Sequence, residues 1–325
     1  MAHSQNPPKT PLILPPEIWN RIIEIALTAD PSFELFTRIA CSCAQFRSFA
    51  AQHYFRHVIL PNEKNHWNRF CSLLHSHESF TWVRSLRASS QTLIPAVNNP
   101  GAATSIALLT RLEELSVDLE AEGFVTQQPF LKLLCKHIHS SCQLTVLVLT
   151  SLPRIDIPLL RMIVESFPHL VELHLSSSER LDLHCWDCYQ DSLELTLHSP
   201  IPDMFSDPKS MAIIFARILQ PLIHLTHLHL GIFLSNEMLT LNHVVHGRRE
   251  GGAAFGPDEC ILCDKAANAV ELDELTAALE FAQRLKALRD VGFSSFFDRS
   301  SPDELSTVVY ILREGGRIRV RKSPW

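Results

Sequence analysis

The sequence has no long apolar run and no motif of a familiar enzyme chemistry. No stretch reaches the roughly 18 consecutive apolar residues that span a bilayer, so we expect no membrane partner. The Gly-x-Ser-x-Gly elbow, the Gly-x-x-x-x-Gly-Lys phosphate loop, a Gly-x-Gly-x-x-Gly turn after a strand and His-Glu-x-x-His are all missing. These absences favour a binding protein with no catalytic residues and no cofactor.

An excess of positive charge is also missing. The chain has 29 Lys and Arg against 35 Asp and Glu, a net charge of -6, so nothing points to nucleic acid as a partner. Residues 1–11 are polar and lack the apolar run of a signal peptide, and we expect a disordered tail there. The nine cysteines are an odd number, which favours free thiols in a reducing compartment. We therefore expect a cytoplasmic or nuclear protein.

Residues 12–60 have the pattern of three short helices. Pro15 and Pro16 fit the first turn of a helix, and Glu17 favours its positive N-terminus. Asp30-Pro31 ends this helix and starts a second, and a third is expected over Ser42–His53. So small a module buries a small fraction of its surface. It therefore needs a partner or a following domain.

The opening and closing residues of this module resemble the F-box. They are Leu14-Pro15-x-Glu17-Ile18, then Ile22 and Leu27, then Cys43-x-x-Phe46-Arg47-x-Phe49-Ala50. In that family the segment docks on the Skp-type adaptor of SCF ubiquitin ligases, and through it on a cullin, while the rest of the chain holds the substrate. The resemblance implies adaptor contacts by Leu14, Pro15, Ile18, Ile22 and Phe46, although Phe46 stands where the family usually has Trp. The alternative is a helical cap that only covers the next domain.

Leucine-type residues recur at positions i, i+3 and i+5 after a first strand predicted at Phe55–Leu60. The sets are Val83/Leu86/Ala88, Leu112/Leu115/Val117, Leu144/Leu147/Leu149, Leu170/Leu173/Leu175, Leu225/Leu228/Leu230 and Leu288/Val291/Phe293, with a less regular Leu193/Leu195/Leu197 between the fourth and fifth. Helical periodicity lies between them, at His66–Phe80, Pro129–Ile138, Ile157–Phe167, Met211–Leu219 and Leu272–Leu288. Each strand-helix unit needs neighbours to cover its apolar side.

This pattern resembles leucine-rich repeats. The predicted fold class is α/β, an N-terminal trihelical F-box followed over residues 61–325 by an irregular leucine-rich-repeat solenoid of strand-helix units. The alternative is a leucine-rich α/β domain whose strands are not a true repeat. A glycine-rich insertion interrupts the pattern from Ser235 to Lys265, or to residue 270 at most, and Glu314–Arg321 is predicted to form a turn and an edge strand.

Two Cys-x-x-Cys pairs are the main candidates for metal chemistry. Cys185 and Cys188 form one pair, Cys260 and Cys263 the other, and together they could supply four thiolates to zinc. The pairs are much further apart in sequence than in zinc ribbons. We therefore predict ordinary cysteines and no metal, with a zinc site or a redox dithiol as the alternatives.

The residues between the leucines are the candidate target-binding surface, because side chains alternate across a strand. They form two predicted rows, Glu114, Val146, Glu172, Glu194 and His227 in one, and Ser116, Val148, His174, Thr196 and His229 in the next. We single out Glu114, Glu172, His174, Glu194, His227 and His229 as substrate-binding candidates. Such a face favours a basic or hydrogen-bond-donor segment, with histidines sensitive between about pH 5 and 8. The alternatives are a solvated face, and a site in the insertion around Arg248 and Arg249.

These patterns favour a non-catalytic substrate-recognition subunit of an SCF-type E3 ubiquitin ligase, whose target is an unknown protein. A scaffold that carries an F-box but acts outside a ligase is the nearest alternative. A zinc-dependent enzyme built on the cysteine pairs is the alternative from another class.

Overall fold

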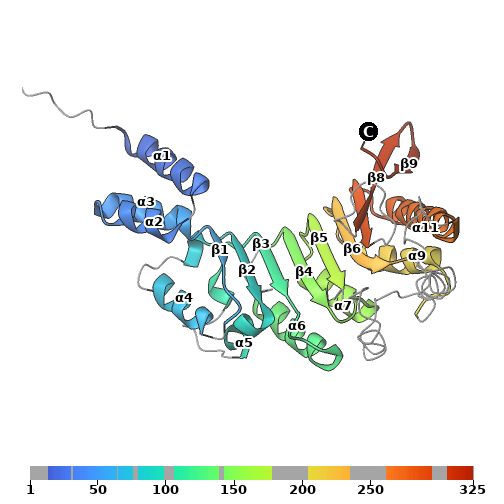
Figure 1. Ribbon diagram of the computed structural model, residues 1–325, viewed down its shortest axis with the longest axis horizontal. Coiled ribbons are helices and arrows are strands. Elements are labelled where there is room, and N and C mark those ends of the chain that lie inside the picture. The colour runs from blue at the N-terminus through green and yellow to red at the C-terminus, as the bar shows by residue number, and fades with distance from the viewer. Residues whose placement is uncertain are drawn as a thin grey trace, which may run out of the picture. The chain divides into compact units, whose positions relative to one another are not determined.

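The computed structural model describes residues 14–30, 32–63, 65–75, 80–98, 106–138, 143–177, 204–234, 261–294 and 306–324. The chain divides into two compact units, unit 1 up to Val58 and unit 2 from Ile59 (Figure 1). The predicted boundary, after residue 60, lies two residues further along. The protein is of the mixed α/β class. Within the described ranges, every helix is too short or too polar to cross a membrane.

Unit 1 consists of the three predicted helices, α1 (Pro16–Ala29), α2 (Phe33–Ala40) and α3 (Ala44–Tyr54). Local chemistry sets where each begins. Pro16 occupies the first turn of α1, where a missing N–H costs nothing. The Ser32 hydroxyl accepts a hydrogen bond from the Leu35 amide at 3.2 Å, and the Cys43 thiol accepts one from the Phe46 amide at 3.4 Å. Both side chains act as N-caps.

The core of unit 1 is small. Ile23, Leu27 and Ala50 are buried at its centre. Partly buried side chains pack around them, namely Leu35, Phe36, Ile39, Phe46, Phe49 and Tyr54. A core of this size leaves much of the apolar surface of three helices uncovered.

Unit 2 is organised by one sheet whose strands follow in chain order (Figure 1). The strands are β1 (His57–Ile59), β2 (Ser85–Ser89), β3 (Glu114–Asp118), β4 (Val146–Leu152), β5 (Glu172–Ser177), β6 (His227–Phe233), β7 (Asp290–Ser294), β8 (Ser306–Glu314) and β9 (Arg317–Arg321). Strands β2 to β7 are parallel, whereas β8 and β9 are antiparallel to their neighbours. The unit boundary falls within β1.

The leucine spacing correctly predicted the six parallel strands. Leu86, Leu115, Leu147, Leu173, Leu228 and Val291 are partners across the sheet, as are Ala88, Val117, Leu149, Leu175, Leu230 and Phe293. Every one of these side chains is buried. The seventh, less regular set at residues 193–197 lies outside the described residues, and β5 pairs directly with β6.

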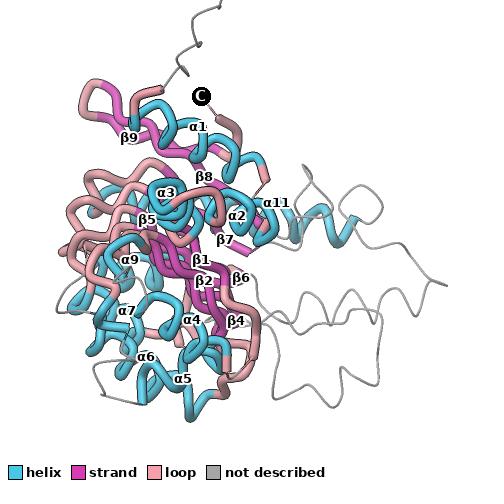
Figure 2. Tube along the Cα trace, turned by 90° about the vertical axis from the view of Figure 1, so that its left-hand side faces the viewer, coloured by secondary structure: helices cyan, strands magenta, loops and turns pink. Residues whose placement is uncertain are grey.

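Helices link the parallel strands and cover one face of the sheet, as the views along and across it show for α4 to α9 (Figures 1 and 2). They are α4 (His66–His75), α5 (Ser90–Asn98), α6 (Phe124–Ile138), α7 (Ile157–Ser166), α9 (Pro208–Leu219) and α11 (Ile261–Arg284), with 3-10 turns at Phe80–Trp82 and Ile106–Leu108. The opposite face of β3 to β6 carries the described residues of the predicted rows. The sequence did not predict α5, which contains Pro95.

Several predicted boundaries are wrong. The helix predicted over Leu272–Leu288 is α11, which runs from Ile261 to Arg284, and the helix predicted from Met211 begins at Pro208. Pro129 was expected to begin a helix, but it lies inside α6. Tertiary contacts hold the turn before it, because the Gln127 amide group bonds both to the Arg154 carbonyl oxygen at 2.8 Å and to the Arg154 amide at 3.0 Å. The insertion predicted to reach residue 265 or 270 ends earlier, since α11 begins at Ile261. Residues 235–260 lie outside the described ranges.

The C-terminal turn and edge strand are confirmed. Gly315 and Gly316 have φ angles of 55° and 76°, which favour glycine, and they join β8 to β9. The sequence pattern did not predict β8, nor the change from parallel to antiparallel pairing after β7. The arginines at 317, 319 and 321 lie on the outermost strand.

Candidate functional site

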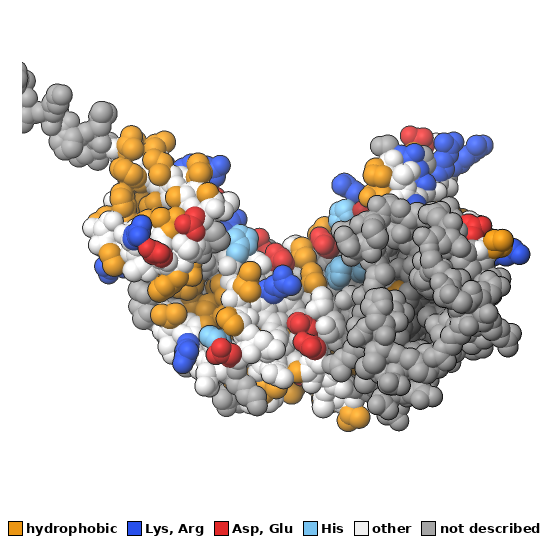
Figure 3. All heavy atoms as spheres, viewed as in Figure 1, with side chains coloured by type: hydrophobic (Ala, Val, Ile, Leu, Met, Phe, Trp, Pro, Cys, Tyr) orange, Lys and Arg blue, Asp and Glu red, His pale blue; other side chains and the backbone are white. Residues whose placement is uncertain are grey.

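Helix α1 carries apolar residues on two faces. Ile23 and Leu27 point into the core of unit 1. Ile18, Ile22 and Ile25, spaced by four and three residues, share another face and are 47%, 42% and 56% exposed. Orange side chains gather over this unit in Figure 3. A contiguous exposed apolar stripe of this kind is typical of a surface that binds another protein.

The predicted adaptor contacts divide between this stripe and the interior. Ile18, Ile22 and Pro15 are exposed, whereas Leu14 is half-buried. Phe46 is also half-buried, with its ring centroid 4.9 Å from that of Trp19. Phe46 therefore contributes to the packing of unit 1 and presents only part of its ring outward.

The open face of the sheet in unit 2 carries two rows of mainly polar residues. One row runs Glu114, Val146, Glu172, His227 and Asp290, and the next Ser116, Val148, His174, His229 and Gly292. The predicted rows are in register, with one correction. Glu194 was expected between Glu172 and His227, but these two are direct partners. Glu194 and Thr196 lie outside the described residues.

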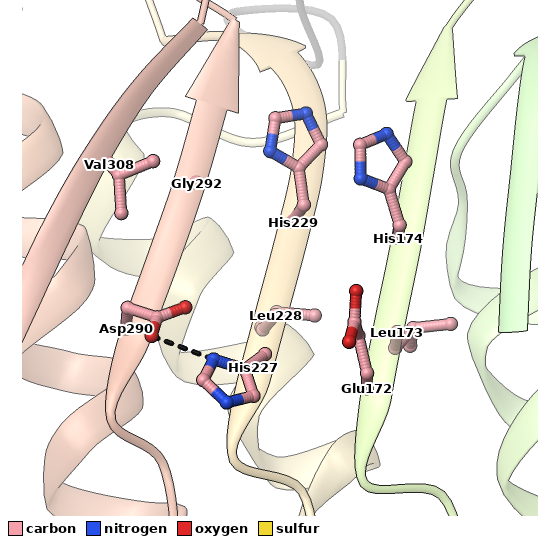
Figure 4. A pocket seen from close by; sticks show the side chains of 9 residues that line it. All are labelled: Glu172, Leu173, His174, His227, Leu228, His229, Asp290, Gly292 and Val308. Atoms are coloured by element: carbon pink, nitrogen blue, oxygen red, sulfur yellow. Dashed lines mark hydrogen bonds and ion pairs between the residues drawn. The ribbon is translucent and has the colours of Figure 1, made fainter. Parts of the chain in front are cut away.

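A pocket of about 230 Å³ opens on this face at strands β5 to β8 (Figure 4). The structure brings four of the six predicted target-binding residues together here. Glu114 lies in the same row, two strands away on β3. The lining residues are Glu172, Leu173, His174, His227, Leu228, His229, Asp290, Gly292 and Val308.

Asp290 fixes the orientation of His227. The Nδ1 atom of His227 lies 2.7 Å from Oδ2 of Asp290 on the neighbouring strand. An ionised carboxylate only accepts hydrogen bonds, so Nδ1 donates. In the neutral ring, Nε2 is then left as an acceptor.

His174 and His229 form a stacked pair in the second row. Their ring centroids are 4.0 Å apart and their planes differ by 10°. Burial, followed by the charge of His174, lowers the pKa of His229 to about 3, and burial lowers the pKa of His174. Both rings are therefore neutral at neutral pH. The sensitivity expected between pH 5 and 8 is therefore wrong for His229. Burial in the stacked pair removes the water that would stabilise the protonated form of its ring.

Glu172 is the open acceptor of the pocket. It is half-buried, and its carboxylate forms no hydrogen bond or ion pair with any residue in the described part of the chain. In Figure 4, Glu172 and Asp290 stand on either side of His227, and the histidine pair lies in the row above. The pocket thus presents two carboxylates and neutral imidazoles, an acceptor-rich and negatively charged lining.

Five lining residues were not among the predicted candidates. Leu173 and Leu228 were predicted as buried leucines of the strands, whereas Asp290, Gly292 and Val308 were not predicted at all. Asp290 and Gly292 flank Val291 in the last leucine-type set, so extending both rows by one strand would have found them. Val308 belongs to β8, a strand that the leucine spacing did not predict. The alternation of Thr307, Val309 and Ile311, all buried, is the signal that could have revealed that strand.

The predicted cysteine pairs cannot be placed in this site. Cys185, Cys188 and Cys260 lie outside the described residues, as does the side chain of Cys263. Among the side chains that are described, no group of three or more His, Cys, Asp or Glu is arranged to hold a metal ion.

Neither a protein-family model nor a curated protein sequence matches this chain.

Proposed function

We propose that this protein is the substrate-recognition subunit of an SCF-type E3 ubiquitin ligase, acting in the cytoplasm or nucleus. Unit 1 would bind a Skp-type adaptor, and unit 2 would hold the target protein. One observation carries the proposal. The segment whose residues resemble the F-box is a three-helix unit, and its first helix has a second apolar face, formed by Ile18, Ile22 and Ile25, that its own core does not cover.

This stripe can contribute part of the binding free energy of such a complex. Burying an isoleucine side chain fully contributes roughly 1.5–3 kcal/mol, and each of these three has about half of that area left to bury. The three together offer on the order of 3 kcal/mol before the contributions of Leu14, Pro15 and Phe46. Unit 2 supports the other half of the proposal, because the helices that the structure describes cover one face of the sheet and leave the opposite face and its pocket available to a target.

The test is a double substitution in the full chain. Ile18→Asp with Ile22→Asp puts two charges on the stripe without touching the buried Ile23 and Leu27. We expect capture of a Skp-type adaptor to fall at least tenfold, with an unchanged melting temperature. The matched control is Ile223→Asp with Leu272→Asp, which charges two apolar residues of unit 2 that are 69% and 65% exposed.

Equal adaptor capture by the native chain and the Ile18/Ile22 variant would overturn the proposal. Capture of the adaptor without a cullin would instead indicate a scaffold that works outside a ligase.

A further inference from the structure

The pocket on β5 to β8 has the chemistry of a cation-binding site. Its two carboxylates, from Glu172 and Asp290, lie on either side of His227 (Figure 4). Asp290 is bonded to His227, whereas the Glu172 carboxylate has no partner within the described ranges. A half-buried carboxylate that lacks a donor is the strongest acceptor in such a site, because a charge-assisted hydrogen bond is about twice as strong as a neutral one.

The histidine pair does not supply positive charge to oppose a cation. His174 and His229 stack at 4.0 Å, and the packing of these rings disfavours their protonated forms. Each neutral imidazole keeps one nitrogen as an acceptor. Among the residues that the structure describes, no Lys or Arg side chain lines the pocket. The lining therefore repels anions and favours a donor-rich cation.

The acceptors lie on three neighbouring strands, Glu172 on β5, His227 on β6 and Asp290 on β7. Adjacent strands are about 4.8 Å apart, so the acceptors are spread over a width of about 10 Å. An ammonium group is a compact point charge, whereas a guanidinium presents five N–H donors in a planar fork. The guanidinium of an arginine can donate to Glu172 and to a second acceptor at the same time. The ammonium of a lysine is less suited to two acceptors on different strands.

We propose that this pocket binds the side chain of an arginine presented by another protein, with Glu172 as the principal acceptor and the His227–Asp290 pair as the second. This inference rests on the proposed function in one respect. It takes the protein that carries the arginine to be the target that unit 2 binds. Because Gly292 has no side chain, the His229 ring occupies the space above it on β7. Val308 lines the pocket on the side of β8.

The test uses the full chain and three small probes, N-acetyl-arginine amide and its lysine and citrulline counterparts. Citrulline has nearly the shape of arginine but no charge. Binding is followed through the NMR signals of isotope-labelled histidine rings. We expect arginine to shift the signals of His227 and His229 with a dissociation constant in the millimolar range, and citrulline to bind at least tenfold more weakly.

The matched variants are Glu172→Gln and Glu114→Gln. Both remove one carboxylate from the same row of the sheet, but only Glu172 lines the pocket. We expect at least tenfold weaker arginine binding for Glu172→Gln and unchanged binding for Glu114→Gln. Citrulline binding as tightly as arginine, or no loss with Glu172→Gln, would overturn the proposal, and equal binding of lysine would overturn the choice of arginine.

Adaptor capture by the Glu172→Gln variant separates the two proposals. If the arginine probe does not bind but the adaptor does, only the pocket assignment is wrong. If arginine binds but no adaptor is captured, the pocket stands and the ligase function fails.

Discussion

Gly292 lies directly opposite His229, and a Cβ atom on Gly292 would fall 2.2 Å from the Nδ1 atom of that histidine. The imidazole of His229 therefore occupies the volume that any other residue at position 292 would need. On its other side in the row, His229 stacks on His174, with the two ring centroids 4.0 Å apart. The stacked pair depends on a missing side chain one strand away.

A Gly292→Ala substitution should displace the His229 ring and break the stack. Overpacking of this kind typically costs about 1–3 kcal/mol, measurable as a lower urea midpoint. The double variant Gly292→Ala with His229→Ala should recover part of that loss, because the added methyl group then has room. If the single variant is as stable as the native chain, His229 does not occupy the position described.

The stability of the protein should fall in acid in a way that depends on His229. Its pKa is about 3 in the folded state, against 6.5 in an unfolded chain, so the unfolded state takes up the proton first. Stability from this group is complete above pH 6.5 and is lost as the pH falls from 6.5 towards 3. Urea midpoints at pH 7 and 4.5 should therefore differ less in His229→Gln than in the native chain. The ring signal of His229 should not titrate between pH 8 and 5, and a midpoint near 6.5 would contradict this.

Arg313 should stabilise the end of α11. Its Nη2 atom donates to the carbonyl oxygens of Ala282 and Leu285, each at 2.9 Å, and its Nη1 atom donates to that of Leu288. The Ala282 and Leu285 carbonyls lie at the C-terminal end of α11, where a helix leaves its last oxygens without a helical partner, and the Leu288 carbonyl lies in the turn that follows. Arg313→Ala should lower the free energy of unfolding by about 2 kcal/mol. Arg313→Lys should fall between the two, since lysine keeps the charge but not the fork. The exposed Arg317→Ala is the control, and an equal effect there would refute the capping role.

The ion pair between Lys322 and Glu274 should hold the last strand against α11. Glu274 is fully buried, and its Oε2 atom lies 2.7 Å from the Nζ atom of Lys322. Lys322→Met leaves the buried carboxylate without this cation, at a cost of roughly 3 kcal/mol. Adding Glu274→Leu should recover most of the loss, because the pair is then replaced by apolar groups. Additive effects of the two substitutions in thermal unfolding would show that they are not coupled.

The sequence alone determined the features that rest on local chemistry. The prolines at 15 and 16 and the residues Ser32 and Cys43 mark the starts of the three helices of unit 1, because caps act within one turn. The leucine spacing determined the parallel strands and their register, because shifting a strand by one residue would turn its leucines out of the core. The same alternation placed Glu172, His174, His227 and His229 on one face.

Only the tertiary structure decided which of those residues meet. The pairing of β5 directly with β6 removed the predicted place of Glu194, and the pairing of β6 with β7 brought Asp290 to His227 and Gly292 to His229. Burial, and then the neighbouring His174 on β5, also lowered the pKa of His229, which no local pattern reveals. Likewise α6 begins before Pro129, because hydrogen bonds join Gln127 to Arg154 in a distant segment. In each case the deciding interaction joins residues that are far apart in the sequence. Tertiary packing brings them together in space, and a local sequence pattern carries no information about that packing.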